Sequence, residues 1–491
     1  MVWTGEEIVT ATAAASNAAS VARTRFEAVC TDSRRIAPAA LFVALRGTHH
    51  DGHRFAADAL RAGAAAVLVD AVPAGVDPHR ALVVTDTLRA LGDLAAYTRR
   101  RWAGRVAAIT GSNGKTTTKE MLAAICAAAF LPPPRGGVRP SAPRASAVEG
   151  GGQVLKTHAN ENNLIGLPLT LLRLRGDESV AVLEMGMNAL GEIARMTDIA
   201  APDVGLITNI GPAHLEGLGT IAGVAAAKHE LFDHMRPDNT IAVNMDDEWV
   251  VRGAARFRGP RIEFGEGRAV SARGLVDAGI DGIGFTLCIG ARTAPVRLHM
   301  AGRHNLQNAL GAAAVAHALG IDIEAIAAGL GAAAPPKMRM QVVRLANGVT
   351  LINDAYNANP GSTEAALDAV GRCAGRAVAV LGEMRELGAQ SAALHREVGA
   401  HAARCGVRWL IAVGPQADEI AAGARAAATD LEVSVCDDAA GATALLLTHW
   451  QSGDTILIKG SRGPDDDDSV RRYGARMAEV AARLEAAAGR A

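Results

Sequence analysis

The segment TGSNGKTTTK at residues 110–119 constrains the fold more than any other part of the chain. It follows the apolar run VAAIT (106–110) and precedes a stretch with helical spacing of apolar residues, 116–130. A buried strand, a glycine turn and a helix in this order are typical of the start of a nucleotide-binding α/β domain. The segment therefore predicts a parallel sheet with a phosphate-binding loop at its carboxyl edge.

Within this loop, Gly111 and Gly114 let backbone N–H groups approach a phosphate, and the helix that follows favours anions at its start. We predict that Lys115 holds the β- and γ-phosphates of a nucleotide and that Thr116 ligates magnesium. The full G-x-x-x-x-G-K-[ST] pattern is not met, because Ile109 stands where its first glycine should be. A tight turn with a solvated lysine is the alternative, but it does not explain the run of threonines.

Strand-like runs divide the 491 residues into three α/β domains, in line with a prior of roughly 150 residues per domain. Residues 1–86 form a small domain, with strands at 41–45 and 65–69 around a helix at 55–62. Residues 87–334 form the central domain, with further parallel strands at 180–185, 204–208 and 240–244. After Pro335 and Pro336, residues 335–491 form a second doubly wound domain, with strands at 349–354, 377–382, 409–414 and 455–460. The Pro-, Gly- and Ser-rich segment 132–152 is predicted to be a disordered insertion.

Composition excludes several functional classes. The formal net charge of -1 indicates no basic surface for nucleic acid. No apolar run reaches about 18 residues, and the first 25 residues lack the pattern of a signal peptide. We therefore expect a cytoplasmic monomer that binds no nucleic acid and inserts into no membrane. The six cysteines contain no CxxC pair, which argues against a metal site or a disulfide framework and predicts reduced, mostly buried thiols.

Three polar residues are candidates for the site, two of them where a parallel sheet places its sites. Glu184 and His214 each follow a predicted strand, so both can reach a metal ion or a phosphate at the carboxyl edge. The alternatives are a helix-capping glutamate and a structural histidine. Lys228 lies on an alanine-rich helix, in a chain where only six of the 50 basic residues are lysines. This retention suggests that a compact or modifiable amine is needed, although a solvated helical lysine is the alternative.

Amide side chains gather in two later segments. GRHNLQNAL (302–310) places Asn305 and Asn308 on one face of a helix, where they can contact the base or phosphates of a nucleotide. The alternative is that Asn305 caps this helix. NDAYNANPGS (353–362) ends a strand in a loop dense in amides, with Asp354 and Tyr356 at the sheet edge. That density favours recognition of a peptide or a nucleotide over a plain turn.

Taken together, these segments resemble the Mur ligase family over nearly the whole chain apart from 132–152. The motifs that carry the resemblance, in family order, are TGSNGKTTTK, ENNLIGLPLTLL (161–172), EMGMNALGEI (184–193), TNIGPAHLEG (208–217), AAAKHE (225–230), GRHNLQNAL and KGSR (459–462). Within the family, NDAYNANP, LGEMRELG (381–388) and TLLRL (170–174) are similar to the member that adds a dipeptide. A sister amino-acid-adding ligase and a catalytically decayed nucleotide-binding protein remain as alternatives.

The resemblance implies three domains: an N-terminal domain that binds the UDP end of a substrate, a central P-loop parallel-sheet ATPase and a C-terminal Rossmann-like domain. It implies ATP and Mg²⁺ as cofactors, and UDP-N-acetylmuramoyl-tripeptide and D-alanyl-D-alanine as substrates. The implied reaction proceeds through an acyl phosphate to UDP-N-acetylmuramoyl-pentapeptide, ADP and phosphate, a step in the synthesis of peptidoglycan precursors.

The resemblance also implies roles for individual residues. Those implied to be catalytic are Lys115, Glu184, His214 and Lys228, and those implied to bind metal are Thr116, Glu184, His214 and, once carbamylated, Lys228. ATP is expected to contact Gly111, Ser112, Asn113, Gly114, Lys115, Thr116, Thr117, Asn305, Asn308, Arg339 and Asp354. The other substrates are expected to contact Ser33, Arg34, Gly47, Asn160, Asn162, Asn163, Tyr356, Asn357, Asn359 and Lys459.

Two segments depart from the family pattern. Ala159 stands where relatives usually carry glycine, so the backbone there is expected to approach the substrate less closely. After KGSR the chain reads GPDDDD (463–468) in place of the usual start of a helix. These aspartates can cap a helix that begins near Val470, or they can weaken the approach of an anionic substrate.

Overall fold

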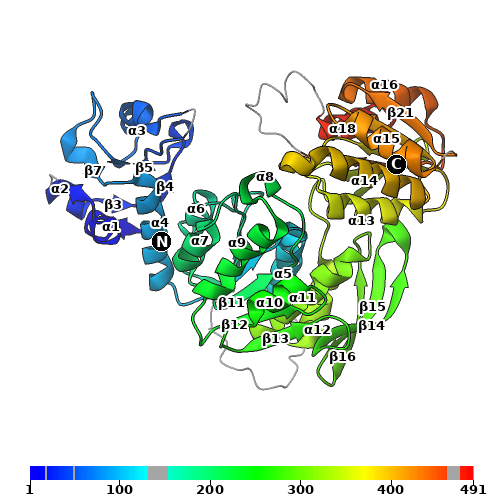
Figure 1. The fold of residues 1–491 in the computed structure, drawn as a ribbon. Helices are drawn as coiled ribbons and strands as arrows, with labels where there is room; N and C mark the ends of the chain where they lie inside the picture. The colour runs from blue at the N-terminus through cyan, green and yellow to red at the C-terminus, as the bar shows by residue number, and fades with distance from the viewer. Residues whose placement is uncertain (17–18, 48–49, 131–152, 429, 462–475, 490–491) are drawn as a thin grey trace.

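The computed structural model describes residues 1–491 except 17–18, 48–49, 131–152, 429, 462–475 and 490–491. Three α/β domains follow one another along the chain, which confirms the predicted fold class (Figure 1). The predicted insertion at 132–152 and the GPDDDD segment lie outside the described residues.

The N-terminal domain is built on a five-stranded sheet in the order β2-β7-β6-β5-β4. Strands β4 to β7 run parallel, and β2 pairs antiparallel with β7. The predicted strands and the helix between them are present as β5, α3 and β6. The elements are β1 (Trp3–Thr4), α1 (Gly5–Thr12), β2 (Ala15–Ser16), α2 (Ala19–Arg23), β3 (Arg25–Phe26), β4 (Ala28–Cys30), η1 (Ser33–Arg35), β5 (Ala40–Val43), η2 (Gly52–Phe55), α3 (Ala56–Arg61), β6 (Ala66–Val69), η3 (Pro78–Arg80) and β7 (Ala81–Val83).

The central domain holds a nine-stranded sheet in the order β16-β15-β14-β13-β12-β11-β8-β10-β9. The strands from β9 to β14 run parallel, whereas β14, β15 and β16 form an antiparallel extension that the sequence patterns did not predict. Its strands are β8 (Arg105–Thr110), β9 (Gln153–Lys156), β10 (Glu178–Glu184), β11 (Val204–Ile207), β12 (Thr240–Asn244), β13 (Arg261–Phe264), β14 (Val270–Asp277), β15 (Ile283–Ile289) and β16 (Arg292–Leu298).

Helices cover both faces of this sheet, because its strands are apolar on both sides. In β8, Val106 and Ala108 face one core while Ala107 and Ile109 face the other. Helices α5, α11 and α12 cover the second face, and α4, α6, α7, α9 and α10 cover the first. The helices are α4 (Thr87–Arg101), α5 (Lys115–Phe130), α6 (Gly166–Leu171), α7 (Glu192–Ala200), α8 (Leu215–Leu218), α9 (Ile221–His234), α10 (Glu248–Ala254), η4 (Gly279–Asp281), α11 (His304–Ala318) and α12 (Ile323–Ala332).

The C-terminal domain is a six-stranded sheet in the order β17-β18-β22-β19-β20-β21, parallel except at the edge strand β17. Helices α13, α14 and α15 pack on one face and α16 and α18 on the other. The elements are β17 (Gln341–Arg344), β18 (Thr350–Asp354), α13 (Pro360–Gly371), β19 (Ala377–Leu381), η5 (Gly388–Gln390), α14 (Ser391–Arg404), β20 (Trp409–Val413), α15 (Ala417–Ala427), β21 (Glu432–Cys436), α16 (Ala439–His449), β22 (Thr455–Lys459) and α18 (Met477–Ala488).

Two predictions from composition can be compared with this fold. All six cysteines are unpaired, as predicted, but only Cys126 and Cys288 are buried and the other four are half-buried, so the prediction of mostly buried thiols was wrong. Among the described residues no helix is long and apolar enough to cross a membrane. The exact boundaries at 86/87 and 334/335 stay predictions.

Candidate functional site

The loop 111–114 lies at the carboxyl end of β8, whose neighbours in the sheet are β10 on one side and β11 on the other. The strand order switches at β8, because the next strands of the chain lie on opposite sides of it. Open α/β sheets bind ligands at such switch points. Gly111 and Gly114 adopt positive φ angles of 148° and 80°. A Cβ on Gly111 would meet Thr208 Oγ1 at 1.9 Å, and one on Gly114 would meet Asn308 Oδ1 at 2.1 Å. Glycine is therefore required at both positions.

Neighbouring strands hold the loop in place. The backbone N–H groups of Ser112 and Asn113 donate to the carbonyl and side-chain oxygens of Asn209, at 2.9 Å each. Their N–H groups are therefore already used, and the groups left for an anion are those of the first turn of α5, which have no acceptor within the helix. Lys115 folds back so that its Nζ donates to Gly111 O at 2.7 Å, and burial lowers its pKa. The Lys115 amine therefore lies next to the position predicted for the phosphates.

Glu184 ends β10 and is almost fully buried, with 2% of its surface exposed. Its Oε1 accepts a hydrogen bond from Asn162 Nδ2 at 2.8 Å, and its backbone N–H donates to Thr157 Oγ1 at 2.9 Å. Its Oε2 has no hydrogen-bond partner within the described parts of the chain and lies 3.6 Å from Lys119 Nζ. A buried carboxylate oxygen with a lone pair to offer fits a divalent cation, and the helix-capping alternative does not describe this residue.

Lys228 is fully buried on α9, so the alternative of a solvated helical lysine is wrong. Its Nζ has no hydrogen-bond partner among the described residues. Burial lowers its pKa well below the usual value, and the cation of Lys115 lowers it further. A buried amine without a partner is costly to keep, which indicates a role other than stability.

His214 joins the central domain to the C-terminal domain. Its Nδ1 lies 2.6 Å from Glu386 Oε2, and this contact holds the pKa of the Glu386 carboxyl below its usual value. The backbone N–H of Glu216 also donates to Glu386 O at 3.1 Å. Both His214 and Glu386 have positive φ angles, of 55° and 63°. Two strained non-glycine residues in contact at a domain boundary are typical of a functional junction.

Asn305 and Asn308 do lie on one face of α11, as predicted. Asn305 Nδ2 donates to Ala301 O at 2.7 Å, and Asn308 Nδ2 donates to Asn305 Oδ1 at 2.9 Å. Asn305 therefore does not cap the helix with its side chain. Asn308 Oδ1 lies 3.4 Å from Thr118 Oγ1 and packs against Gly114, which places this pair behind the phosphate-binding loop.

Residues of the C-terminal domain line the same pocket as the loop. Arg339 Nη2 lies 3.4 Å from Thr116 Oγ1, and the Arg339 guanidinium stacks 4.2 Å from the ring centre of Tyr356. Asn359 Nδ2 donates to Asn113 Oδ1 at 2.7 Å. The pocket is lined by Ser112, Asn113, Gly114, Lys115, Thr116, Arg339, Asn357, Asn359 and Ser362. The structure thus brings these predicted residues together from two domains.

Asp354 and Lys459, predicted to contact ligands, are paired with each other. Lys459 Nζ lies 2.5 Å from Asp354 Oδ2 and also donates to Asn357 O at 3.1 Å, while Asp354 Oδ1 accepts from Met340 N at 2.9 Å. The side chains are 2% and 9% exposed. This buried pair supports the 353–362 loop from below, at the ends of β22 and β18.

Of the residues predicted to contact the UDP-linked substrate, Asn162 reaches the site through Glu184, whereas the others lie apart from the phosphate-binding loop. Ser33 and Arg34 are in η1, where Arg34 pairs with Asp32, and Gly47 is exposed after β5. Asn160 and Asn163 are exposed in the loop between β9 and α6, where Asn163 Oδ1 accepts from Ile165 N and Gly166 N. Among the described residues, no hydrogen bond connects Ser33, Arg34 or Gly47 with the phosphate-binding loop.

The loop 157–163 shows the effect of the departure at position 159. Ala159 adopts a φ of 47°, in the left-handed region that glycine occupies freely and alanine does not. The backbone thus keeps a conformation that suits glycine in spite of the alanine. That the backbone here approaches the substrate less closely stays a prediction.

Sequence patterns missed three residues that shape the site. Lys119 is fully buried, donates to Thr157 O at 2.9 Å and approaches Glu120 Oε1 at 3.2 Å. Its place at the end of the TTTK run was the only available signal. Asn209 and Glu386 were missed because their partners lie about a hundred or more residues away along the chain.

Comparison with known proteins identifies the class of protein that this fold and site define. Models of the Mur ligase family match three segments: the Mur ligase family, catalytic domain, at residues 25–99, the Mur ligase middle domain at 109–316, and the Mur ligase, glutamate ligase domain, at 338–462. The chain belongs to the Mur ligase family.

Individual relatives are more specific. The chain is 38% identical over 455 residues to the UDP-N-acetylmuramoyl-tripeptide--D-alanyl-D-alanine ligase of Escherichia coli K12, covering 91% of this chain and 93% of that protein. The crystal structure of MurF from Acinetobacter baumannii has a TM-score of 0.84 at 33% identity, covering 96% of this chain and 99% of that one. MurF ligase from Thermotoga maritima in complex with ADP has a TM-score of 0.75 at 27% identity, covering 93% and 98%.

Proposed function

We infer that this chain uses ATP to join D-alanyl-D-alanine to UDP-N-acetylmuramoyl-tripeptide, and so makes a peptide bond in a peptidoglycan precursor. The inference rests on the match of nearly the whole chain to ligases of this kind. The residues expected to be catalytic are also all present in the chain. Lys115, Glu184 and His214 follow strands at the carboxyl edge of the central sheet, and the buried Lys228 is close enough to Lys115 for that cation to lower its pKa. The intact groups weigh against a decayed nucleotide-binding protein.

The phosphates of ATP are proposed to bind at the first turn of α5. Lys115 leaves its contact with Gly111 O and moves its charge onto the β- and γ-phosphates. Arg339 enters from the C-terminal domain and adds a second cation beside Thr116. Asn308 and Asn305 support the loop from behind and are proposed to contact the nucleotide.

Magnesium fits the donor groups of this site. Glu184 Oε2 is buried and no described residue hydrogen-bonds to it, and Thr116 lies at the loop. We propose that these two and His214 hold Mg²⁺, which supplies positive charge to the transferring phosphoryl group. Lys228 becomes an anionic ligand only once its amine is carbamylated. Its burial lowers its pKa and so favours the neutral amine, which is the form that reacts with carbon dioxide.

In the proposed reaction, a carboxylate oxygen of the tripeptide attacks the γ-phosphorus of ATP, the bond to the ADP oxygen breaks, and an acyl phosphate forms. The amine of D-alanyl-D-alanine then attacks the acyl carbon, loses a proton, and the tetrahedral intermediate expels inorganic phosphate. The Lys115 and Arg339 cations stabilise negative charge on the phosphoryl oxygens. The contacts from the C-terminal domain to Asn113 and Thr116 limit access of water, which would otherwise hydrolyse the acyl phosphate.

The dipeptide is proposed to bind near the loop 353–362. Asn357 and Asn359 of this loop line the pocket, and Tyr356 stacks on Arg339, which lines it too. The Asp354–Lys459 pair holds the base of the loop. The UDP end is proposed to bind at Ser33, Arg34 and Gly47 in the N-terminal domain, with Asn160, Asn162 and Asn163 between the two ends. The monomeric state and the cytoplasmic location stay predictions.

The first test is phosphate release by the purified protein with ATP, magnesium, UDP-N-acetylmuramoyl-tripeptide and D-alanyl-D-alanine, with each omitted in turn. We expect release only when all are present. Replacing the dipeptide by diaminopimelate, lysine or glutamate distinguishes sister ligases, because release driven by a single amino acid would overturn the inference. ATP binding without any release would favour the non-catalytic alternative.

A further inference from the structure

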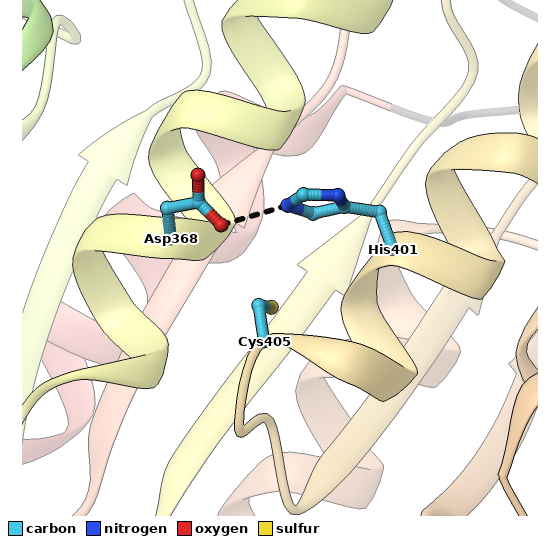
Figure 2. A group of neighbouring side chains, drawn as sticks. All are labelled: Asp368, His401 and Cys405. Atoms are coloured by element: carbon cyan, nitrogen blue, oxygen red, sulfur yellow. Dashed lines mark hydrogen bonds and ion pairs between the residues drawn. The ribbon is translucent and has the colours of Figure 1, made fainter.

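A cluster of side chains on the C-terminal domain, distant in sequence from the nucleotide loop, has the donor atoms of a metal site. His401 lies in the last turn of α14 and Cys405 four residues later, so both project from the same face of the helix. Asp368 reaches the same place from the neighbouring helix α13. Figure 2 shows the His401 ring directed at the Asp368 carboxylate, with Cys405 beside them.

The spacing of these groups suits a small cation. His401 Nε2 lies 2.8 Å from Asp368 Oδ1, and one donor atom from each of the three residues lies within 4.8 Å of the others. Zinc bonds of about 2.0–2.3 Å would place tetrahedral donors roughly 3.5 Å apart. Small rotations of the three side chains are therefore enough to enclose an ion, without movement of the helices.

The backbone fixes this arrangement. A Cβ on Gly371, at the end of α13, would lie 1.8 Å from Cys405 O, and one on Gly406 would lie 2.7 Å from Gly371 O. The ends of α13 and α14 are thus in direct contact, which sets the distance between Asp368 and Cys405. All three donor side chains are half-buried, so an ion and a water molecule can reach them.

The chemistry of the donors selects the kind of ion. An imidazole, a thiolate and a carboxylate together favour zinc or a similar transition metal over magnesium or calcium, which prefer oxygen ligands. The bland interpretation is an ordinary surface ion pair beside an inert thiol at a helix end. Under that interpretation Cys405 would bind no ion, and its Sγ would keep its weak backbone contacts, such as that to Ala402 O at 3.4 Å.

We propose that Asp368, His401 and Cys405 bind a zinc-type divalent transition-metal ion, with water as the fourth ligand, and that the ion ties α13 to α14. This departs from the sequence-based expectation, in which scattered cysteines without a CxxC pair argue against a metal site. Burial raises the pKa of the Cys405 thiol, so binding displaces a proton from Sγ.

The tie connects the two helices that support the pocket from the C-terminal side. Helix α13 begins beside Asn359, which contacts Asn113, and α14 carries His395, whose Nε2 accepts a hydrogen bond from Met384 N at 2.8 Å. A bound ion therefore fixes the C-terminal ends of α13 and α14 relative to each other, and through these helices it restrains the segments around 359 and 384. The site does not depend on the proposed ligase activity.

Titration of the full-length, nucleotide-free protein with Co²⁺ tests the proposal, because a thiolate ligand gives a sulfur-to-cobalt charge-transfer band that oxygen and nitrogen ligands alone do not. We expect a saturable band that Zn²⁺ abolishes by competition. Cys405→Ala should remove the band, and His401→Gln and Asp368→Asn should weaken the affinity by about tenfold or more. Cys373→Ala is the matched control, since Cys373 is a half-buried thiol near the end of α13 that lies outside the cluster.

A second measurement keeps the test independent of the band. Zn²⁺ should raise the melting temperature of the wild type and of Cys373→Ala in a concentration-dependent manner, and should leave that of Cys405→Ala unchanged. A band that survives in Cys405→Ala, a band lost in Cys373→Ala, or no band in the wild type at saturating cobalt would each overturn the proposal.

Discussion

Replacing Lys228 by methionine is expected to stabilise the fold while it abolishes ligation. The Lys228 amine is fully buried and has no hydrogen-bond partner among the described residues. Leaving a polar group buried and unsatisfied costs about 1–3 kcal/mol. Methionine has a similar length and no polar group, so Lys228→Met should raise the free energy of unfolding of the central domain by about that amount.

Lys119 provides a matched control in the same domain. It is also fully buried, but its amine donates to Thr157 O and lies between Glu120 and Glu184. Removing one partner of a buried ion pair typically costs about 3–5 kcal/mol, because the other charge is left uncompensated. Lys119→Met should therefore lower the free energy of unfolding, the opposite sign from Lys228→Met, although the two substitutions are chemically the same.

The effect at Lys228 should also depend on pH. Burial lowers its pKa in the folded protein below the value of about 10.4 for the unfolded chain. Between the two values the unfolded state binds more protons, so the stability of the wild type rises with pH there. The advantage of Lys228→Met over the wild type should accordingly shrink as the pH is raised toward 10.4.

The free energy of unfolding of the central domain is measured by urea unfolding, followed through hydrogen exchange of the α9 segment. This probe reports on the central domain alone, which matters in a protein of three domains. Nucleotide, magnesium and bicarbonate are left out so that the amine stays unmodified. A Lys228→Met variant that is less stable than the wild type would refute the reasoning, as would a Lys119→Met variant that loses no stability. Phosphate release is measured in parallel and should be lost in Lys228→Met.

Three further predictions concern the pocket. Lys115→Ala should abolish phosphate release while UDP-substrate binding, measured by calorimetry, is unchanged; loss of both would contradict separate sites. Asn359→Asp keeps the acceptor that caps α13 but loses the donor to Asn113, so it should weaken ATP affinity with little change in melting temperature, whereas Asn359→Ala should also lose about 0.5–2 kcal/mol of stability. In the wild type, the contact between the Glu386 carboxylate and His214 is fully present above the unfolded carboxyl pKa and is lost as the pH falls through the lowered folded pKa. Glu386→Gln removes this carboxylate, so the ATP affinity of the variant should lack the corresponding pH dependence.

The sheets and the phosphate-binding loop could be predicted from local patterns. Strands such as 106–110 and 377–381 are apolar on both faces, and this leaves a continuous signal in the sequence. The loop could be found because its two glycines, Lys115 and the threonines lie together in TGSNGKTTTK, between an apolar strand and a helix. Elements whose conformation depends on neighbouring residues of the chain can therefore be predicted from the sequence.

The burial of Lys228 could not be read in this way. Its helix is lined with alanines on several sides, so the spacing of apolar residues does not show which face is covered. The antiparallel strands β14 to β16 were missed for a related reason, since β14 alternates poorly and is exposed along much of its length. In both cases the deciding contacts are made by other elements of the fold.

The junction between the central and C-terminal domains was least accessible to sequence reasoning, and it explains how the site is completed. Asn359 meets Asn113 across 246 residues of chain, and Arg339 meets Thr116 across 223. Neither domain alone offers both the first turn of α5 and the second cation. Because His214 and Glu386 hold strained backbone conformations where the domains meet, the contact is not one that the local sequence favours. We therefore expect the binding of ATP and the substrates to strengthen these contacts between the two domains, since the reactants would touch residues of both.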